Sequence, residues 1–170
     1  VRRMFGLGGL RTWKELNGES CIEFEDGFEA RQSICVSRSF SKEIYDLDPL
    51  CEQVANFASS MAEKLRKQNS SASEMTVFAY TNRFKECSPQ TFVTQLVCFP
   101  TPTNDQRTIV TSAVMNMKEI FRHGYGYKKA GVVATHIVQN SDIIPSLFED
   151  SKALEKDHRI TAALDAINSS

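Results

Sequence analysis

The residues best suited to chemistry form one short run, Ser37-Arg38-Ser39-Phe40-Ser41-Lys42, with three hydroxyls, a guanidinium and an ammonium within six residues. Hydroxyls donate short hydrogen bonds to phosphate oxygens, and arginine offers them a bidentate fork. The run therefore favours a phosphate contact, although the solvent-facing end of an ordinary strand would have the same composition. Lys128-Lys129 adds charge later in the chain, either for the same contact or for solubility.

Motifs for catalysis or metal binding are absent from the sequence. His123, His136 and His158 are scattered without ligand spacing, and the five cysteines contain no CxxC pair. The glycine-rich stretches 6–9 and 124–127 lack the spacing of a phosphate-cradling loop, and no GxSxG occurs. We therefore expect no catalytic residue, metal site or cofactor in this chain.

Composition indicates one packed domain with short appendages, because 170 residues with 41% hydrophobic and 24% charged side chains match the usual globular balance. No apolar stretch approaches the length of a membrane span or a signal peptide core, so we expect a soluble, cytoplasmic protein. The net charge is -1, but residues 31–130 hold thirteen Lys or Arg against nine Asp or Glu, between two acidic ends. This basic middle is a weak sign of a surface that faces a polyanion.

Apolar periodicity predicts six main elements in the order βαββαβ. The four strands are expected over 31–44, 75–82, 91–99 and 130–138. The first helix begins near Asp48-Pro49 and carries an apolar stripe from Leu50 to Leu65. The second helix begins over 101–105, carries a stripe from Ile109 to Ile120 and ends near His123-Gly124. Helices over 4–16 and 152–167, an acidic linker over 19–29 and a turn over 68–74 complete the expected chain.

This order predicts an α+β fold of the split βαβ, ferredoxin-like kind, a four-stranded sheet with two helices on one face and the other face open. The open face would bind a partner or remain a polar surface. Alternation places Arg38 on the same side as Ile34 and Val36, so either a bulge redirects it or the buried face ends before it.

Three motifs, in this order and spacing, resemble the C-terminal region of UmuC-type Y-family (translesion) DNA polymerases. They are Ser37-Arg38-Ser39-Phe40, Pro102-Thr103 at a helix start, and the stretch from Gly124 to Val132. The resemblance implies the end of a thumb helix and a linker over 1–28, a little finger DNA-binding domain over 29–140, and a tail over 141–170. In that family the catalytic palm, with its Mg²⁺ site, lies upstream, so we expect this chain not to polymerise DNA.

The resemblance implies that the sheet presses into the major groove and grips duplex phosphates without reading sequence, in SOS-type DNA repair and lesion bypass. The implied partners are duplex primer-template DNA, the sliding clamp and a UmuD-type accessory protein, with no membrane. The DNA-binding residues expected from the run and the resemblance are Ser37, Arg38, Ser39, Lys42, Thr81, Asn82, Arg83, Lys128 and Lys129.

The tail of this family carries a clamp-binding peptide of the form Gln-x-x-Leu-Phe. Leu147 and Phe148 match it, whereas Ile144 stands at the glutamine position. The resemblance implies clamp binding through these three residues, and the alternative is that the apolar pair folds back on the domain. For the whole chain, the alternative is a ferredoxin-like regulatory or protein-interaction domain whose open sheet face binds a protein.

Overall fold

The computed structural model describes residues 2–21, 32–85 and 87–143, and the chain divides into two compact units, residues 1–30 and 31–170. In the first unit, α1 spans Arg2–Leu16 and is kinked at Gly6, where φ is 65°. The predicted helix end is confirmed: Gly18 adopts a φ of 85°, and the Glu19 amide donates to the Lys14 carbonyl at 3.0 Å.

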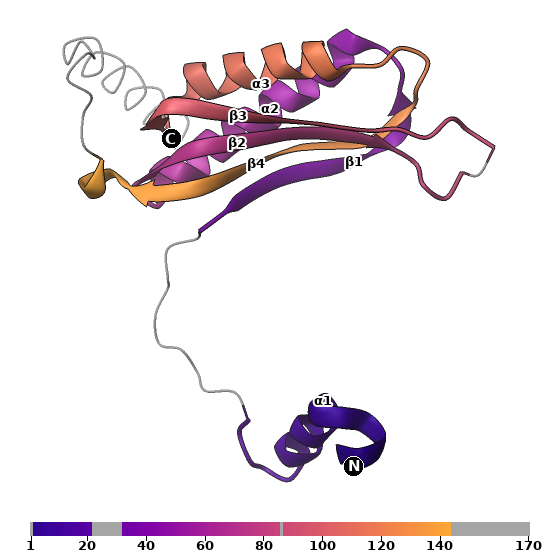
Figure 1. Ribbon diagram of the computed structural model, residues 1–170, viewed down its shortest axis with the longest axis vertical. Coiled ribbons are helices and arrows are strands. Elements are labelled where there is room, and N and C mark those ends of the chain that lie inside the picture. The colour runs from indigo at the N-terminus through magenta and orange to yellow at the C-terminus, as the bar shows by residue number, and fades with distance from the viewer. Residues whose placement is uncertain (1, 22–31, 86, 144–170) are drawn as a thin grey trace. The chain divides into compact units, whose positions relative to one another are not determined.

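The second unit has the predicted βαββαβ order (Figure 1). Its elements are β1 (Ile34–Ile44), α2 (Leu47–Lys67), β2 (Ser70–Thr81), β3 (Phe92–Thr103), α3 (Gln106–Ile120), β4 (Tyr127–Gln139) and the short 3-10 helix η1 (Asn140–Asp142). In the described parts of the chain, no helix is long and apolar enough to cross a membrane.

The four strands form one antiparallel sheet in the order β1-β4-β2-β3. Both βαβ units are split, because β4 lies between β1 and β2, and β2 lies between β3 and β4. Helices α2 and α3 cover the same face of the sheet, and no described helix lies on the other face (Figure 1). The predicted α+β fold with one open sheet face is therefore confirmed.

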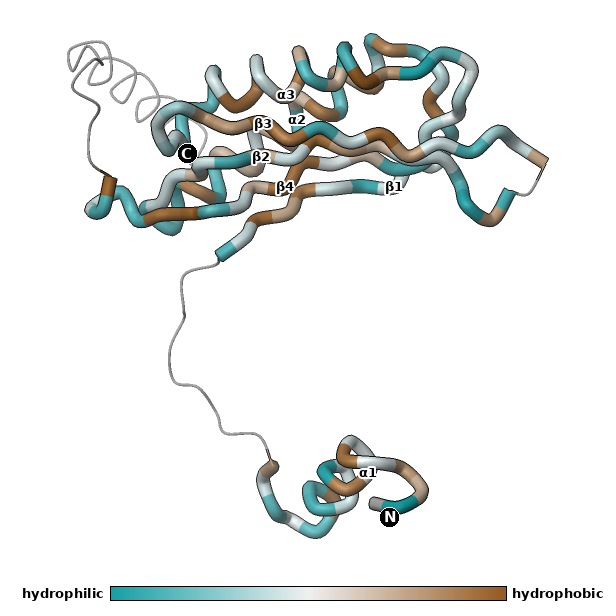
Figure 2. The backbone as a smooth tube through the Cα atoms, in the orientation of Figure 1, coloured by the Kyte–Doolittle hydropathy of each residue, from teal (hydrophilic) through white to brown (hydrophobic). Residues whose placement is uncertain are grey.

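The core lies between the two helices and the face of the sheet that they cover. Along α2, the predicted stripe of Leu50, Val54 and Leu65 is completely buried. On β2, the buried side chains of Val77 and Ala79 alternate with the more exposed Phe78 and Tyr80. Hydrophobic and hydrophilic positions therefore alternate along the helices and strands (Figure 2). This alternation separates a packed face from an open face.

Two predicted boundaries were wrong. A turn was expected over 68–74, but β2 already begins at Ser70, which pairs with Gln139 of β4. The Ser70 hydroxyl donates to the Leu65 carbonyl at 3.2 Å, so this polar residue is satisfied inside the fold.

The other wrong boundary is the end of β3, which was expected at 99 but continues through Pro100 and Pro102 to Thr103. Proline is tolerated there because β3 is an edge strand and because the two prolines lie where the β2–β3 register shifts, between the pairs Glu74–Cys98 and Ala72–Thr103. Helix α3 then begins at Gln106, and Asp105 caps it by accepting from the Thr108 amide at 2.7 Å.

Candidate nucleic-acid interface

Strand pairing brings together two basic runs that lie about 90 residues apart in the sequence. Ser39 of β1 pairs with Lys129 of β4, and the Lys128 ammonium donates to the Ser41 carbonyl at 3.0 Å. Four cations therefore gather at one end of the β1–β4 pair. We call this group the basic edge, and its members are Arg38, Lys42, Lys128 and Lys129.

Arg38 lies on the side of the sheet that the helices cover, as the alternation predicted. It pairs with the fully buried Ala130, yet its own side chain is exposed at the edge strand. The buried face does not end before Arg38, because Phe40, the next residue on the same side of β1, packs against the core. The register then shifts between Ser39 and Ile44, where β1 bulges. A shallow groove follows this bulge, and Gln53 of α2 forms its other wall. Arg38, Ser39 and Lys42 all line the groove, whereas Ser37 does not. Alternation along β1 places Ser37 and Ser39 on the open-face side of the strand.

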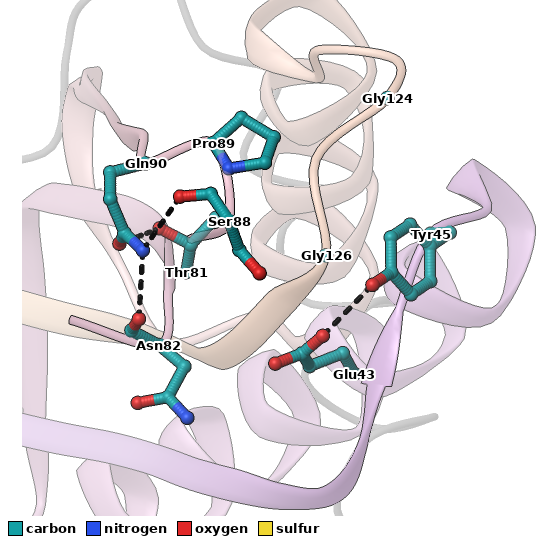
Figure 3. Close-up of a pocket in the computed structure, with 9 residues that line it drawn as sticks. All are labelled: Glu43, Tyr45, Thr81, Asn82, Ser88, Pro89, Gln90, Gly124 and Gly126. Atoms are coloured by element: carbon teal, nitrogen blue, oxygen red, sulfur yellow. Dashed lines mark hydrogen bonds between the residues drawn. The ribbon is translucent and has the colours of Figure 1, made fainter. Parts of the chain in front are cut away.

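The loop between β2 and β3 is held by one side chain, Gln90. Its amide nitrogen donates to the carbonyls of Asn82 and Ser88 at 2.9 and 3.1 Å, and its amide oxygen accepts from the Thr81 hydroxyl at 2.7 Å (Figure 3). The same amide nitrogen also donates to the Lys85 carbonyl at 3.0 Å. Thr81 is only 3% exposed, so its hydroxyl positions the loop and does not face outward.

Asn82 and Arg83, the other two loop residues expected to contact DNA, differ in whether their side chains are available to a ligand. Asn82 turns the chain, because its side-chain oxygen accepts from the Phe84 amide at 3.1 Å. Arg83 is exposed, and its guanidinium carbon lies 5.6 Å from the centre of the Tyr80 ring. Of the loop residues expected to contact DNA, Arg83 is therefore the one with a charged group available on the surface.

Glu43 lies near the basic edge and is paired with neighbours of its own. The Tyr45 hydroxyl donates to its carboxylate at 2.9 Å (Figure 3). The Lys85 ammonium lies 3.1 Å from the same carboxylate. These two contacts, together with the positive charge of Lys128, lower the pKa of the Glu43 carboxyl below its usual value. The carboxylate therefore stays ionised and balances Lys85, and it also offsets part of the charge of Lys128 in the basic edge.

The structure brings some of the residues predicted to bind DNA close together and leaves others apart. Ser37, Ser39 and Lys129 share the open face, Lys128 and Arg38 border it, and Arg83 lies across the sheet at the end of β2. The predicted clamp-binding residues Ile144, Leu147 and Phe148 lie outside the described residues. Within residues 2–21, 32–85 and 87–143, no group of three His, Cys, Asp or Glu side chains could hold a metal ion.

Sequence reasoning missed three aromatic residues on the open face. Phe78 and Tyr80 alternate with the buried Val77 and Ala79, and Phe92 pairs with Tyr80 across β2 and β3. The alternation in the predicted strand over 75–82 was a sufficient signal for Phe78 and Tyr80, because it assigns them to the uncovered face.

An uncovered sheet face bordered by clustered cations is typical of a domain that binds a polyanion. The family model for the C-terminal domain of the impB/mucB/samB family matches residues 31–147. The chain therefore belongs to this family, which confirms the predicted resemblance to the UmuC-type C-terminal region.

Among curated relatives, the protein ImpB of Salmonella typhimurium is 34% identical over 170 residues, which cover 100% of this chain and 40% of ImpB. The protein UmuC of Salmonella typhimurium strain LT2 is 32% identical over 168 residues, covering 99% of this chain and 40% of UmuC. The chain thus spans about 40% of the length of these relatives.

A solved structure, titled as a complex of the beta-clamp processivity factor and the little finger domain of PolIV, shows a distant likeness. The match covers 70% of this chain and 95% of the matched chain in that structure, with 16% sequence identity and a TM-score of 0.45. At this TM-score the likeness supports no argument about fold or partner.

Proposed function

We propose that this chain is the DNA-binding little finger domain of a translesion polymerase and that it grips duplex phosphates without reading their sequence. The observation that carries the proposal is the β1–β4 register, which places Lys129 beside Ser39 and Lys128 against Ser41. Membership in the impB/mucB/samB family supports it. The upstream polymerase with its Mg²⁺ site, the role in SOS-type lesion bypass and a UmuD-type partner belong to the same proposal.

The chemistry of the basic edge suits the phosphate backbone. Ammonium and guanidinium groups neutralise phosphates and release counterions, while serine hydroxyls add hydrogen bonds that carry no sequence information. In the proposal, Ser37, Ser39 and the four cations contact the backbone, Arg83 adds a further contact, and Thr81 and Asn82 position the loop that bears Arg83. Sequence-independent grip would allow such a domain to hold damaged or arbitrary DNA.

The test is fluorescence anisotropy of two duplexes of unrelated sequence, titrated with salt against the 170-residue chain. We expect Arg38→Ala to weaken binding to both duplexes equally and to reduce the salt slope by about 1, because one phosphate contact is lost. Lys64→Ala is the matched control, because it removes the same charge from an exposed position on α2. Unequal losses on the two duplexes, or equal losses in both variants, would contradict the proposal.

We also propose that the segment 144–148 tethers the chain to the sliding clamp. Leu147 and Phe148 match the family's peptide, although Ile144 replaces its glutamine. An apolar pair in a pocket contributes most of the affinity of such short peptides. Leu147→Ala with Phe148→Ala should therefore eliminate clamp binding in surface plasmon resonance while duplex affinity stays unchanged. Clamp binding that survives this double substitution would exclude the tether.

A further inference from the structure

The open face carries a row of aromatic rings, Phe78, Tyr80 and Phe92, which we call the aromatic platform. The Phe78 and Tyr80 rings have centres 6.2 Å apart and planes only 14° from parallel. The Tyr80 and Phe92 centres are also 6.2 Å apart, at a tilt of 46°. Phe92 is 53% exposed. The platform therefore presents π surfaces on the side of the sheet that no described helix covers.

A glycine in the neighbouring strand makes room for the platform. Gly131 of β4 pairs with Phe78, and a Cβ atom built on Gly131 would lie 2.8 Å from the tip of the Phe78 ring. The ring therefore lies over the β4 backbone, in the space that any other side chain at 131 would occupy. Gly131 is thus the position that lets the Phe78 ring reach over β4.

Cations border the platform on two sides. Arg83 lies over the Tyr80 ring, with 5.6 Å between its guanidinium carbon and the ring centre, and Lys129 pairs with Tyr80 in the neighbouring strand. The described strands contain two acids, Glu43 of β1 and Glu74 of β2. The Glu43 carboxylate is paired with the Lys85 ammonium at 3.1 Å, and Glu74, in the first half of β2, lies 2.9 Å from His136. The cations beside the rings, Arg83 and Lys129, therefore favour an anionic ligand.

We propose that the aromatic platform binds single-stranded DNA by stacking unpaired bases on its rings. This inference rests on the proposed DNA-binding function and adds a second ligand for the same face. Stacking is a sequence-tolerant contact because every base has a π face, and four-stranded sheets with exposed aromatic residues bind single strands in this way. In a duplex the base faces are covered by their neighbours, so the platform discriminates in favour of unpaired DNA.

The register connects the platform to the basic edge. Lys129 pairs with Tyr80 on one side and with Ser39 on the other, so one lysine lies between the rings and the phosphate-binding run. Once the Arg83 guanidinium moves off the Tyr80 ring, a strand whose bases stack on Tyr80 and Phe92 can thus have its phosphates near Lys129 and Arg83. Phenylalanine, tyrosine and arginine are also enriched in protein interfaces, but lysine is depleted there, so the position of Lys129 favours DNA over a protein partner.

The experiment compares three labelled probes bound by the 170-residue chain: an oligo(dT) strand of about 12 nucleotides, an abasic strand of equal length, and a duplex. The abasic strand keeps the phosphates and lacks the bases. We expect the parent chain to bind oligo(dT) at least about tenfold more tightly than the abasic strand. In Tyr80→Ala with Phe92→Ala, only Phe78 of the platform remains, so oligo(dT) affinity should fall most of the way to the abasic level, while abasic and duplex affinities remain.

Leu96→Ala is the control, because Leu96 is 51% exposed on the same face but is not aromatic, and it should leave all three affinities unchanged. Tyr80→Phe keeps the ring and should retain oligo(dT) affinity. Thermal melting establishes that each variant is folded. Equal affinity of the parent chain for oligo(dT) and the abasic strand would overturn the stacking proposal even when duplex binding persists.

Two further outcomes distinguish a failure of the stacking proposal from a failure of the proposed DNA-binding function. No binding to any probe at low salt would remove the proposed DNA-binding function itself. If Tyr80→Ala with Phe92→Ala instead dissociates a dimer in analytical ultracentrifugation and leaves oligo(dT) binding intact, the platform is an interface between protein chains and the stacking proposal is wrong.

Discussion

Gly131→Ala is expected to lower the free energy of unfolding by about 3 kcal/mol, because the sheet has no space for a side chain at this position. The added Cβ would overlap the Ser37 Cβ and lie 2.8 Å from the Val36 carbonyl oxygen. The second contact is with backbone, so β1 and β4 would have to separate. In thermal melting the midpoint should fall by roughly 10 °C.

Gly8→Ala is the matched control for this substitution, because a Cβ at Gly8 meets no atom within 4 Å. It should leave the unfolding of the sheet unchanged. Adding Ser37→Gly to Gly131→Ala removes the shortest contact but not the contact with the Val36 carbonyl, so only part of the loss should be recovered. A Gly131→Ala variant that melts like the parent chain would show that the two strands are not packed so closely.

Tyr127→Phe is expected to cost about 2 kcal/mol, measured by urea unfolding at neutral pH. Tyr127 is completely buried at the start of β4, and its oxygen accepts a hydrogen bond from the Arg122 amide at 3.0 Å. Phenylalanine keeps the packing but leaves that amide without its partner. Tyr125→Phe is the control, because it removes a hydroxyl from a half-buried side chain nearby and should cost less than about 0.5 kcal/mol.

The same tyrosine gives a pH dependence with a defined sign. Burial raises the pKa of the Tyr127 phenol above its usual value of 10.0. The folded state therefore keeps this proton while the unfolded state loses it, so the stabilisation is complete below the unfolded pKa and is lost as pH rises through the folded pKa. Between neutral pH and pH values above 10.0, Tyr127→Phe should lose less stability than the parent chain. Equal losses of stability in the variant and the parent chain would show that the Tyr127 phenol does not cause this pH dependence.

Local sequence patterns were sufficient to predict the elements of the fold. The spacing of Leu50, Val54 and Leu65 predicted α2, and alternation predicted β1, because these patterns follow directly from burying one face of an element. Runs of β-branched and aromatic residues predicted the central parts of β2, β3 and β4, because such side chains fit a pleated sheet. The strand ends at Ser70 and Thr103 were not predictable in this way. They depend on contacts with residues distant in the sequence, such as the pairing of Ser70 with Gln139 and the hydrogen bond from the Asn104 amide to the Ser70 carbonyl, and on the edge position of β3.

The sequence by itself determined which side chains are available: a hydroxyl-rich basic run, a second basic pair, and the motifs that indicate the family. Only the tertiary structure decided that the two basic regions meet, because register between β1 and β4 is a long-range property. It also decided that Thr81 is turned inward, with its hydroxyl bound to Gln90, and that Gly131 leaves space for Phe78. A residue's type sets the bonds that it can make, and the packing around it sets which of those bonds remain available to a ligand.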